Sequence, residues 1–241
     1  MTAALVTITL RALLNRRRTL LLALLGALLV GSVVLYRLSA PSATESLEVT
    51  RGLLADFGLG VLLPVVAVIV GTAAIGSELD DGTIVYLLSK PVPRWLIVLT
   101  KLAVAAVVVA LLVVPATAVT GAIGQGEASL ALPYAIAALA GTLEYTALFV
   151  ALSLVTSRSL IVGLAYVVVW EAVVAGLFAG TRVLSVRQHL LALAEAIGGE
   201  TAAEGDLALE VAAIAATTVI VLAIGIAIRR LQVVELRGET A

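Results

Sequence analysis

The chain has 241 residues, of which 62% are hydrophobic and 13% are charged, and its formal net charge is −1. Soluble domains carry about 45–50% apolar and about 25% charged residues, so an ordinary globular core cannot hide this much apolar surface. The composition therefore predicts a chain whose main solvent is lipid. The near-zero net charge gives no indication of nucleic-acid binding.

Several classes of site are excluded by the residues that are missing. The chain has no cysteine and a single histidine, His189. Disulfides, thiolate metal sites, thiol catalysis and histidine-cluster metal sites are therefore excluded. The phosphate-binding pattern G-x-x-x-x-G-K-[ST] is also missing, so the chain does not bind ATP by that route. We expect no catalytic residue, metal or cofactor in this chain.

The N-terminal segment, residues 3–16, has the pattern of an interfacial helix. Its apolar residues Val6, Leu10, Leu13 and Leu14 recur at helical spacing, and its polar residues fall on another face. Such a helix lies along a membrane surface. A disordered basic tail is the alternative.

Six apolar stretches predict an all-α polytopic membrane protein with six transmembrane helices, folded as one transmembrane domain over residues 1–241. The first apolar run is longer than the apolar core of a signal peptide, so we expect it to stay uncleaved. Little more than Arg158 separates the fourth and fifth stretches, which predicts a tight helical hairpin. The expected spans are about 19–38, 57–77, 96–123, 130–156, 159–181 and 211–229.

Lys and Arg predict the orientation of these spans. With six spans, eleven of the fifteen Lys and Arg residues fall on the side that holds both termini. Short loops rich in Lys and Arg stay in the cytoplasm, so both termini are expected there, in a plasma (inner) membrane protein with several spans.

The segment between the second and third spans, residues 78–94, is therefore expected in the cytoplasm. Ser77 and Asp80 form a capping-box-like pair, and Pro91 ends the short helix that they begin. An apolar patch of Ile84, Val85, Leu87 and Leu88 on this helix needs a partner. The alternative is a loop that only reverses the chain.

The external segment, residues 182–210, contains a second amphipathic pattern. Leu190, Leu191, Leu193, Ala194 and Ile197 recur at helical spacing, and two glycines follow. This pattern predicts an external amphipathic helix between spans five and six, and one interpretation is a helix that rests on lipid. His189 is expected on its solvated face.

Two carboxylates, Glu144 and Glu171, lie near the middle of the fourth and fifth spans. Intramembrane acids are costly and face the protein interior or a water-filled cavity. Glu144 shares a helix face with small residues, which predicts a structural acid in a packed interface. Glu171 has bulkier neighbours. It is expected either in the substrate pathway or in a structural role.

One motif and the span pattern resemble the ABC-2 type of ABC exporter permeases. The motif is E-x-D-x-G-T-I-x-x-L-L-S-K-P-V-x-R, residues 78–94, followed by Lys101. "ALSLVTSRSLIVGLAY", residues 151–166, resembles the hairpin between the fourth and fifth spans of that family. "WEAVVAGLFAGTRVLSVRQ", residues 170–188, resembles a subset of short permeases.

The resemblance implies a coupling helix at residues 78–94 that sits on a separate cytoplasmic ABC ATPase. It also implies an N-terminal elbow helix, and external helices that close the pathway before the sixth span. The coupling residues would be Glu78, Asp80, Asp81, Gly82, Thr83, Ile84, Leu87, Leu88 and Arg94.

The resemblance further implies how the complex is assembled. Two ATPase copies would bind ATP and Mg, and a second permease copy or a sister permease would complete the pathway of an exporter. The sequence does not identify the substrate, but an apolar pathway favours a hydrophobic or amphipathic compound, such as a drug, lipid or peptide. The alternatives are a membrane enzyme, or a passive channel or anchor without an ATPase partner.

Overall fold

The computed structural model describes residues 6, 7, 9, 10, 13, 16–39, 42–80, 93–124 and 130–234. Within these ranges the chain is helical and has no strand, so the predicted all-α class is confirmed. Six of the helical segments are long and apolar enough to cross a membrane. The expected elbow helix lies largely outside the described residues, although Leu13 is described and is buried.

The first three spans are α2, a long second helix and α6. α2 runs from Arg16 to Arg37, and α6 from Arg94 to Ile123. The second helix joins α3 (Ala43–Gly52), the π-helical segment η1 (Leu53–Leu62) and α4 (Leu63–Asp80) without a break. It begins well before the residue 57 expected from hydropathy, because Ser42 and Glu45 form a capping box around its first turn.

The last three spans are α7, a composite fifth helix and α11. α7 is Ala131–Val155, and α11 is Leu209–Val234. The fifth span joins α8 (Ser159–Ala165), the π-helical η2 (Tyr166–Val174) and α9 (Ala175–Leu177). It is followed by the 3-10 helix η3 (Ala179–Leu184) and by α10 (Val186–Gly198), which ends at Gly199 with a φ of 76°.

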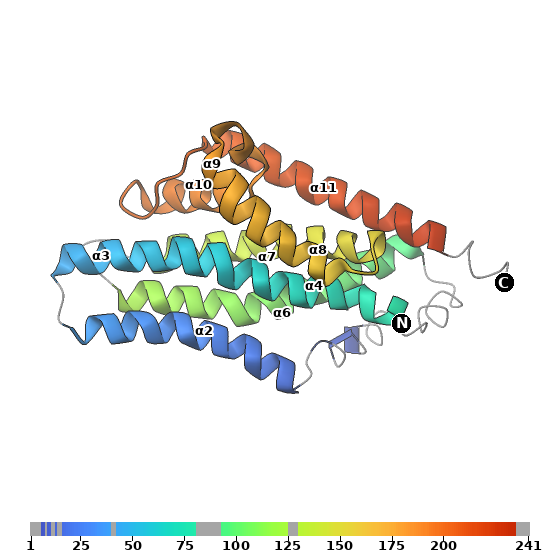
Figure 1. Ribbon diagram of the computed structural model, residues 1–241, viewed down its shortest axis with the longest axis horizontal. Helices are drawn as coiled ribbons and strands as arrows, with labels where there is room; N and C mark the ends of the chain where they lie inside the picture. The colour runs from blue at the N-terminus through green and yellow to red at the C-terminus, as the bar shows by residue number, and fades with distance from the viewer. Residues whose placement is uncertain are drawn as a thin grey trace.

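The long helices lie roughly along one axis, with α10 beside one end of the bundle (Figure 1). We call that end the α10 end, and we call the opposite end, where α2 and α6 begin, the Arg94 end. α7 is the central helix and packs against α4, α6, α10 and α11. Small buried residues on α7, including Ala137, Ala138 and Gly141, allow these close approaches.

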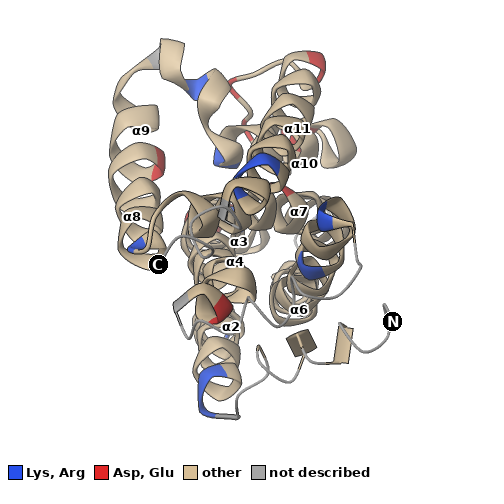
Figure 2. Ribbon diagram, turned by 90° about the vertical axis from the view of Figure 1, so that its right-hand side faces the viewer, with Lys and Arg blue, Asp and Glu red and all other residues tan. Residues whose placement is uncertain are grey.

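The outer faces of the spans are apolar and exposed, as expected for surfaces that meet lipid. On α2, Leu20, Leu21 and Leu24 are each more than 60% exposed. The Arg94 end, viewed in Figure 2, shows α8 and α9 at the margin of the bundle. Buried threonines such as Thr72 and Thr146 donate their hydroxyl hydrogens to carbonyls of their own helices. These two hydroxyls are thus satisfied without water.

The fifth helix contacts the bundle closely at one glycine. A Cβ placed on Gly163 would lie 2.2 Å from Val68 Cγ2 and 3.3 Å from Phe149 Cδ1. Only a residue without a side chain lets α8 approach α4 and α7 this closely.

We predict that Gly163→Ala lowers the thermal unfolding midpoint in detergent relative to Gly225→Ala. Alanine gains about 1 kcal/mol of helix propensity at either position, whereas overpacking at Gly163 costs about 1–3 kcal/mol. Gly225 on α11 is the matched control, because a Cβ placed on it would meet no atom of another helix within 4 Å. An equal gain in midpoint for both variants would contradict the tight contact.

Candidate functional site

The Arg94 end joins the two helices that flank residues 81–92. Lys101 of α6 is 1% exposed, and its Nζ donates to Glu78 Oε1 at 2.6 Å and to the Ala74 carbonyl at 2.8 Å. These contacts fix the start of α6 against the end of α4. A displacement of the intervening segment would therefore reach both helices together.

A second contact at this end ties α6 to the last span. Arg94 Nη1 donates to the carbonyl of Leu231 at 3.2 Å, in the final turns of α11. A cation at the C-terminus of a helix is favourable because the last carbonyls lack helical partners. Of the predicted coupling residues, Glu78 and Arg94 are described in full, and Asp80 ends α4. The others, Asp81, Gly82, Thr83, Ile84, Leu87 and Leu88, lie outside the described residues.

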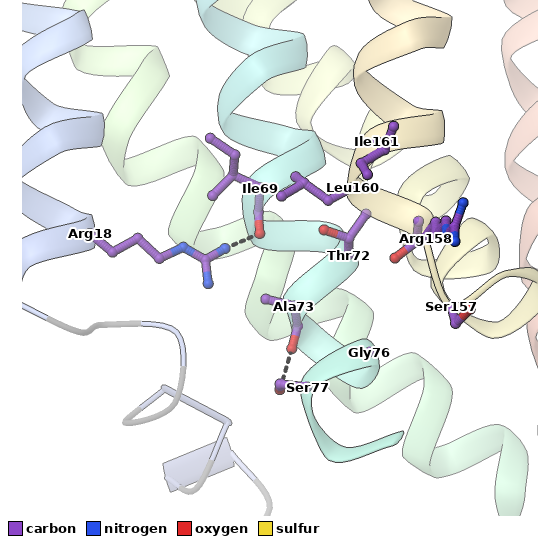
Figure 3. A pocket seen from close by; sticks show the side chains of 11 residues that line it. Arg18, Ile69, Thr72, Ala73, Gly76, Ser77, Ser157, Arg158, Leu160 and Ile161 are labelled. Atoms are coloured by element: carbon purple, nitrogen blue, oxygen red, sulfur yellow. Dashed lines mark hydrogen bonds between the residues drawn. The ribbon is translucent and has the colours of Figure 1, made fainter. Parts of the chain in front are cut away.

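A hollow of about 570 Å³ opens beside this end, between α2, α4 and the turn from α7 to α8 (Figure 3). Arg18 Nη2 donates to the carbonyl of Ile69 across its edge and so ties α2 to α4. The hydroxyls of Thr72 and Ser77 donate to carbonyls of α4. Arg158 stands in the α7–α8 turn at the border of the hollow.

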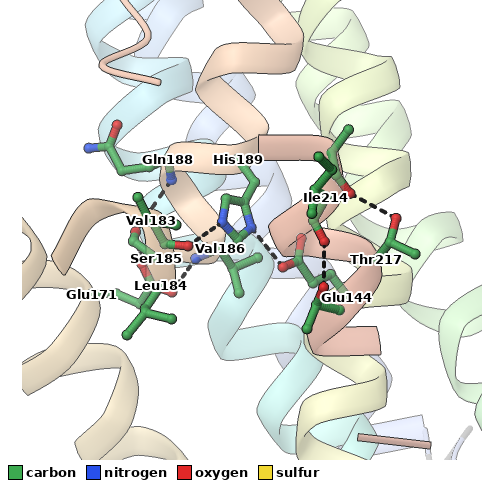
Figure 4. A network of polar contacts seen from close by, with 12 residues as sticks. Glu144, Glu171, Val183, Leu184, Ser185, Val186, Gln188, His189, Ile214 and Thr217 are labelled. Atoms are coloured by element: carbon green, nitrogen blue, oxygen red, sulfur yellow. Dashed lines mark hydrogen bonds and ion pairs between the residues drawn. The ribbon is translucent and has the colours of Figure 1, made fainter. Parts of the chain in front are cut away.

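The α10 end contains the two intramembrane acids: Glu171 binds the start of α10, and Glu144 binds a side chain within α10 (Figure 4). Glu171 lies in η2 and is 4% exposed. Its Oε1 accepts from Tyr166 Oη and from the backbone N–H of Val186, both at 2.9 Å, and its Oε2 accepts from Ser185 Oγ at 2.5 Å. Glu171 therefore completes the N-terminus of α10, where unpaired N–H groups favour a negative charge.

Glu144 binds α10 one turn further along. Its Oε1 lies 2.8 Å from Nδ1 of His189, and the two side chains are 2% and 3% exposed. His189 Nε2 lies 2.9 Å from the carbonyl of Val183 in η3. Burial alone would lower the pKa of His189, but the hydrogen bond and charge of Glu144 outweigh it and hold the pKa above its ordinary value.

A cavity of about 250 Å³ lies next to this pair, between α7, α10 and α11. Its lining is aliphatic apart from Glu144, His189 and Thr217. Among the described residues, no group of three or more His, Cys, Asp or Glu side chains is placed to hold a metal ion. What these acids do in the described structure is join helices.

The prediction that His189 is a solvated face residue is wrong. Val186, His189 and Leu190 occupy positions i, i+3 and i+4 of α10, and this face is buried against α7. The interpretation of α10 as a helix resting on lipid through this face therefore fails as well. Ser185, whose hydroxyl caps α10 through the N–H of Gln188, was a sequence signal for the start of this helix, but it does not determine which face is buried.

The chain is similar to a known protein family. A family model described as "ABC-2 family transporter protein" matches residues 14–181. The matched range covers the first five spans, including the segment between α4 and α6. A search of curated proteins finds no match to the chain.

We predict that Glu78→Ala destabilises the protein by about 3 kcal/mol, because it leaves the buried Lys101 ammonium without its counter-charge. The double variant Glu78→Ala/Lys101→Met should recover most of the loss, as measured by thermal unfolding in detergent. Glu204→Ala is the control, since it removes an exposed ion pair with Arg51 and should change stability by less than about 1 kcal/mol. A double variant no more stable than Glu78→Ala would show that the pair is not what holds α4 to α6.

Proposed function

This chain belongs to the ABC-2 family of transporter proteins, and from that membership we propose that it is the membrane-spanning permease subunit of an ATP-driven exporter. The family match over residues 14–181 is the observation that carries the proposal. It is joined by six helices that can cross a membrane. The chain is a multi-pass transport subunit, and its family implies a partner ATPase that hydrolyses ATP.

We propose that a cytoplasmic ABC ATPase, in two copies with ATP and Mg, binds residues 78–94. A second permease copy or a sister permease would complete the complex in the plasma membrane, with both termini in the cytoplasm. The Lys and Arg bias supports this orientation. The Glu78–Lys101 pair supports the coupling role, because it makes α4 and α6 move with whatever displaces the segment between them.

A hydrophobic or amphipathic substrate, such as a drug, lipid or peptide, fits the surfaces that the bundle presents. A groove of about 390 Å³ between α7, the fifth span and α11 is lined by apolar side chains and the ring of Tyr166. Such a groove offers no ion pair to a fully hydrophilic molecule. A membrane enzyme is the weaker alternative, because the described residues hold no metal-binding cluster.

We predict that Leu87→Asp combined with Leu88→Asp abolishes association with the ATPase while leaving membrane insertion intact. Burying each leucine is worth about 1.5–3 kcal/mol, so charging both should weaken binding at least about a hundredfold. The measurement is co-purification of the ATPase with the permease, together with ATP-dependent transport in vesicles. Ser157→Asp, in the exposed α7–α8 turn at the same end, is the matched control. Survival of both association and transport in the double variant would reduce the segment to a simple connecting loop.

We propose that Glu171 is a substrate-pathway residue whose existing hydrogen bonds limit when a substrate can reach it. Both of its oxygens are occupied by Tyr166, Ser185 and Val186, so a substrate can reach the carboxylate only after these bonds open. The cost of placing an acid in the membrane supports a functional role. A purely structural role at the start of α10 is the competing explanation.

We predict that Glu171→Gln alters transport or substrate-stimulated ATPase activity while expression and assembly stay normal. Glutamine keeps the size and can donate to Ser185 Oγ, but it cannot carry charge. Glu171→Leu should instead lower stability by about 1–3 kcal/mol, because it leaves buried donors unpaired. Unchanged transport by Glu171→Gln across substrates and pH, with a destabilised Glu171→Leu, would assign the residue to structure alone.

A further inference from the structure

The histidine of α10 has an acceptor on each side of its ring. Nδ1 faces Glu144 Oε1 at 2.8 Å, and Nε2 faces the carbonyl oxygen of Val183 at 2.9 Å (Figure 4). A backbone carbonyl can only accept, and an ionised carboxylate can only accept. A neutral imidazole has one N–H and one lone pair, so it can satisfy only one of these two neighbours.

The geometry is therefore complete only when the pair holds an extra proton. With a hydrogen on each ring nitrogen, His189 donates to both Glu144 and Val183. Without that proton, one lone pair faces an acceptor oxygen at hydrogen-bond distance in a buried place, which is unfavourable. A neutral Glu144 acid that donates to Nδ1 would hold the same number of protons. We place the proton on the ring because imidazole is ordinarily the stronger base of the two.

The other charged groups around His189 have partners of their own. From η1, Asp56 pairs with Arg187 of α10, and from η3, Arg182 pairs with Asp206. From η2, Glu171 accepts hydrogen bonds at the start of α10. The α11 residues that line the adjacent cavity carry no titratable group. Glu144 is thus the charged side chain that contacts the ring directly.

We propose that Glu144 and His189 form a proton-binding site, and that the bound proton holds α10 against α7. The proton bridges the two helices in the way a metal ion bridges its ligands. Its contribution to stability is complete below the ordinary histidine pKa of about 6.5 and is lost as the pH rises through the raised pKa of His189. Above that pH the start of α10 keeps Glu171, but the neutral ring can satisfy only one of Glu144 and Val183 and no longer attracts the carboxylate by its charge.

The adjacent cavity leaves space into which α10 can move once the proton has left. It borders Glu144, His189 and Leu190, so α10 can shift toward α11 without first displacing packed atoms. The shift would uncover the face of α10 that is now buried, including Ala194, which is 0% exposed. The site is therefore a place where proton uptake changes the position of a helix.

Because His189 is the sole histidine of the chain, its titration can be observed directly. The full chain, purified with a tag that lacks histidine and reconstituted in lipid nanodiscs, would be labelled with ¹⁵N-histidine. We expect nitrogen shifts of a doubly protonated ring at about pH 6 and a midpoint above about 6.5. A ring with one unprotonated nitrogen at about pH 6, or a midpoint at or below about 6.5, would overturn the proposal.

Two single cysteines on α10 then report whether the proton controls the helix. Ala194→Cys lies on the buried face and Ala196→Cys on the exposed face, and the chain has no native cysteine. Each cysteine is reacted with a methanethiosulfonate reagent, and the rate for Ala194→Cys is divided by the rate for Ala196→Cys. This ratio cancels the ordinary pH dependence of thiol chemistry. We expect this ratio to rise about tenfold as His189 loses its proton, a factor that corresponds to about 1.4 kcal/mol. Ala192→Cys, also buried, repeats the measurement if Ala194→Cys does not fold.

Substitutions at Glu144 distinguish an effect of the bound proton on α10 from an effect of side-chain packing alone. Glu144→Gln supplies an amide N–H that can donate to Nδ1 while Nε2–H donates to Val183, so a neutral ring is fully satisfied. The ratio should then stay low at every pH. Glu144→Leu should give a high ratio at every pH. Glu171→Gln, which keeps the Glu144 contact, should retain a ratio that rises with pH, with the midpoint lowered by the loss of the Glu171 charge. A wild-type pH dependence in Glu144→Gln, or a ratio in the native pair that does not change with pH, would refute the bridging proton.

Discussion

The arrangement of this bundle depends on satisfying buried polar groups where lipid offers no hydrogen bonds. In the hydrocarbon region, each unpaired donor or acceptor costs several kcal/mol, so a polar side chain must find its partner within the protein. Most hydroxyls meet this demand within their own helix, as Thr72 does. The acids Glu144 and Glu171 also need partners outside their own helices: Glu144 finds His189 on α10, and Glu171, besides Tyr166 of its own helix, finds Ser185 and the N–H of Val186 at the start of α10. The position of α10 is thus a consequence of two carboxylates placed on other spans.

The close packing around α7 makes these contacts possible. Gly141 and the alanines of α7 leave room for Leu190 of α10, and a Cβ on Gly141 would lie 2.5 Å from Leu190 Cδ1. With α10 this near, His189 reaches Glu144 without a bridging water. A larger residue at position 141 would move the helix away and separate the ion pair. Apolar packing and polar pairing are therefore coupled at one site.

The sequence predicted the fold class and the number of spans because a helix needs about 20 mostly apolar residues to cross a bilayer, and such stretches can be counted in the sequence. The helix that contains the second span begins at Ala43, before the apolar run, because Ser42 caps it although Glu45 and Glu48 lower the hydropathy of its first turns. The prediction for His189 was wrong, since the histidine's burial depends on Glu144, 45 residues away in the sequence. Periodicity within one helix reports which residues share a face, but the partner of that face is set by tertiary packing.

The two ends of the bundle differ in the chemistry that holds them. At the Arg94 end, arginines donate to backbone carbonyls at Ile69 and Leu231. A guanidinium stays protonated throughout the pH range in which proteins work, and a carbonyl does not titrate, so these contacts are insensitive to pH. At the α10 end, the corresponding donor is an imidazole, whose charge changes near neutral pH. A change in proton concentration near neutral pH therefore acts on the His189 contact and leaves these two arginine contacts unchanged.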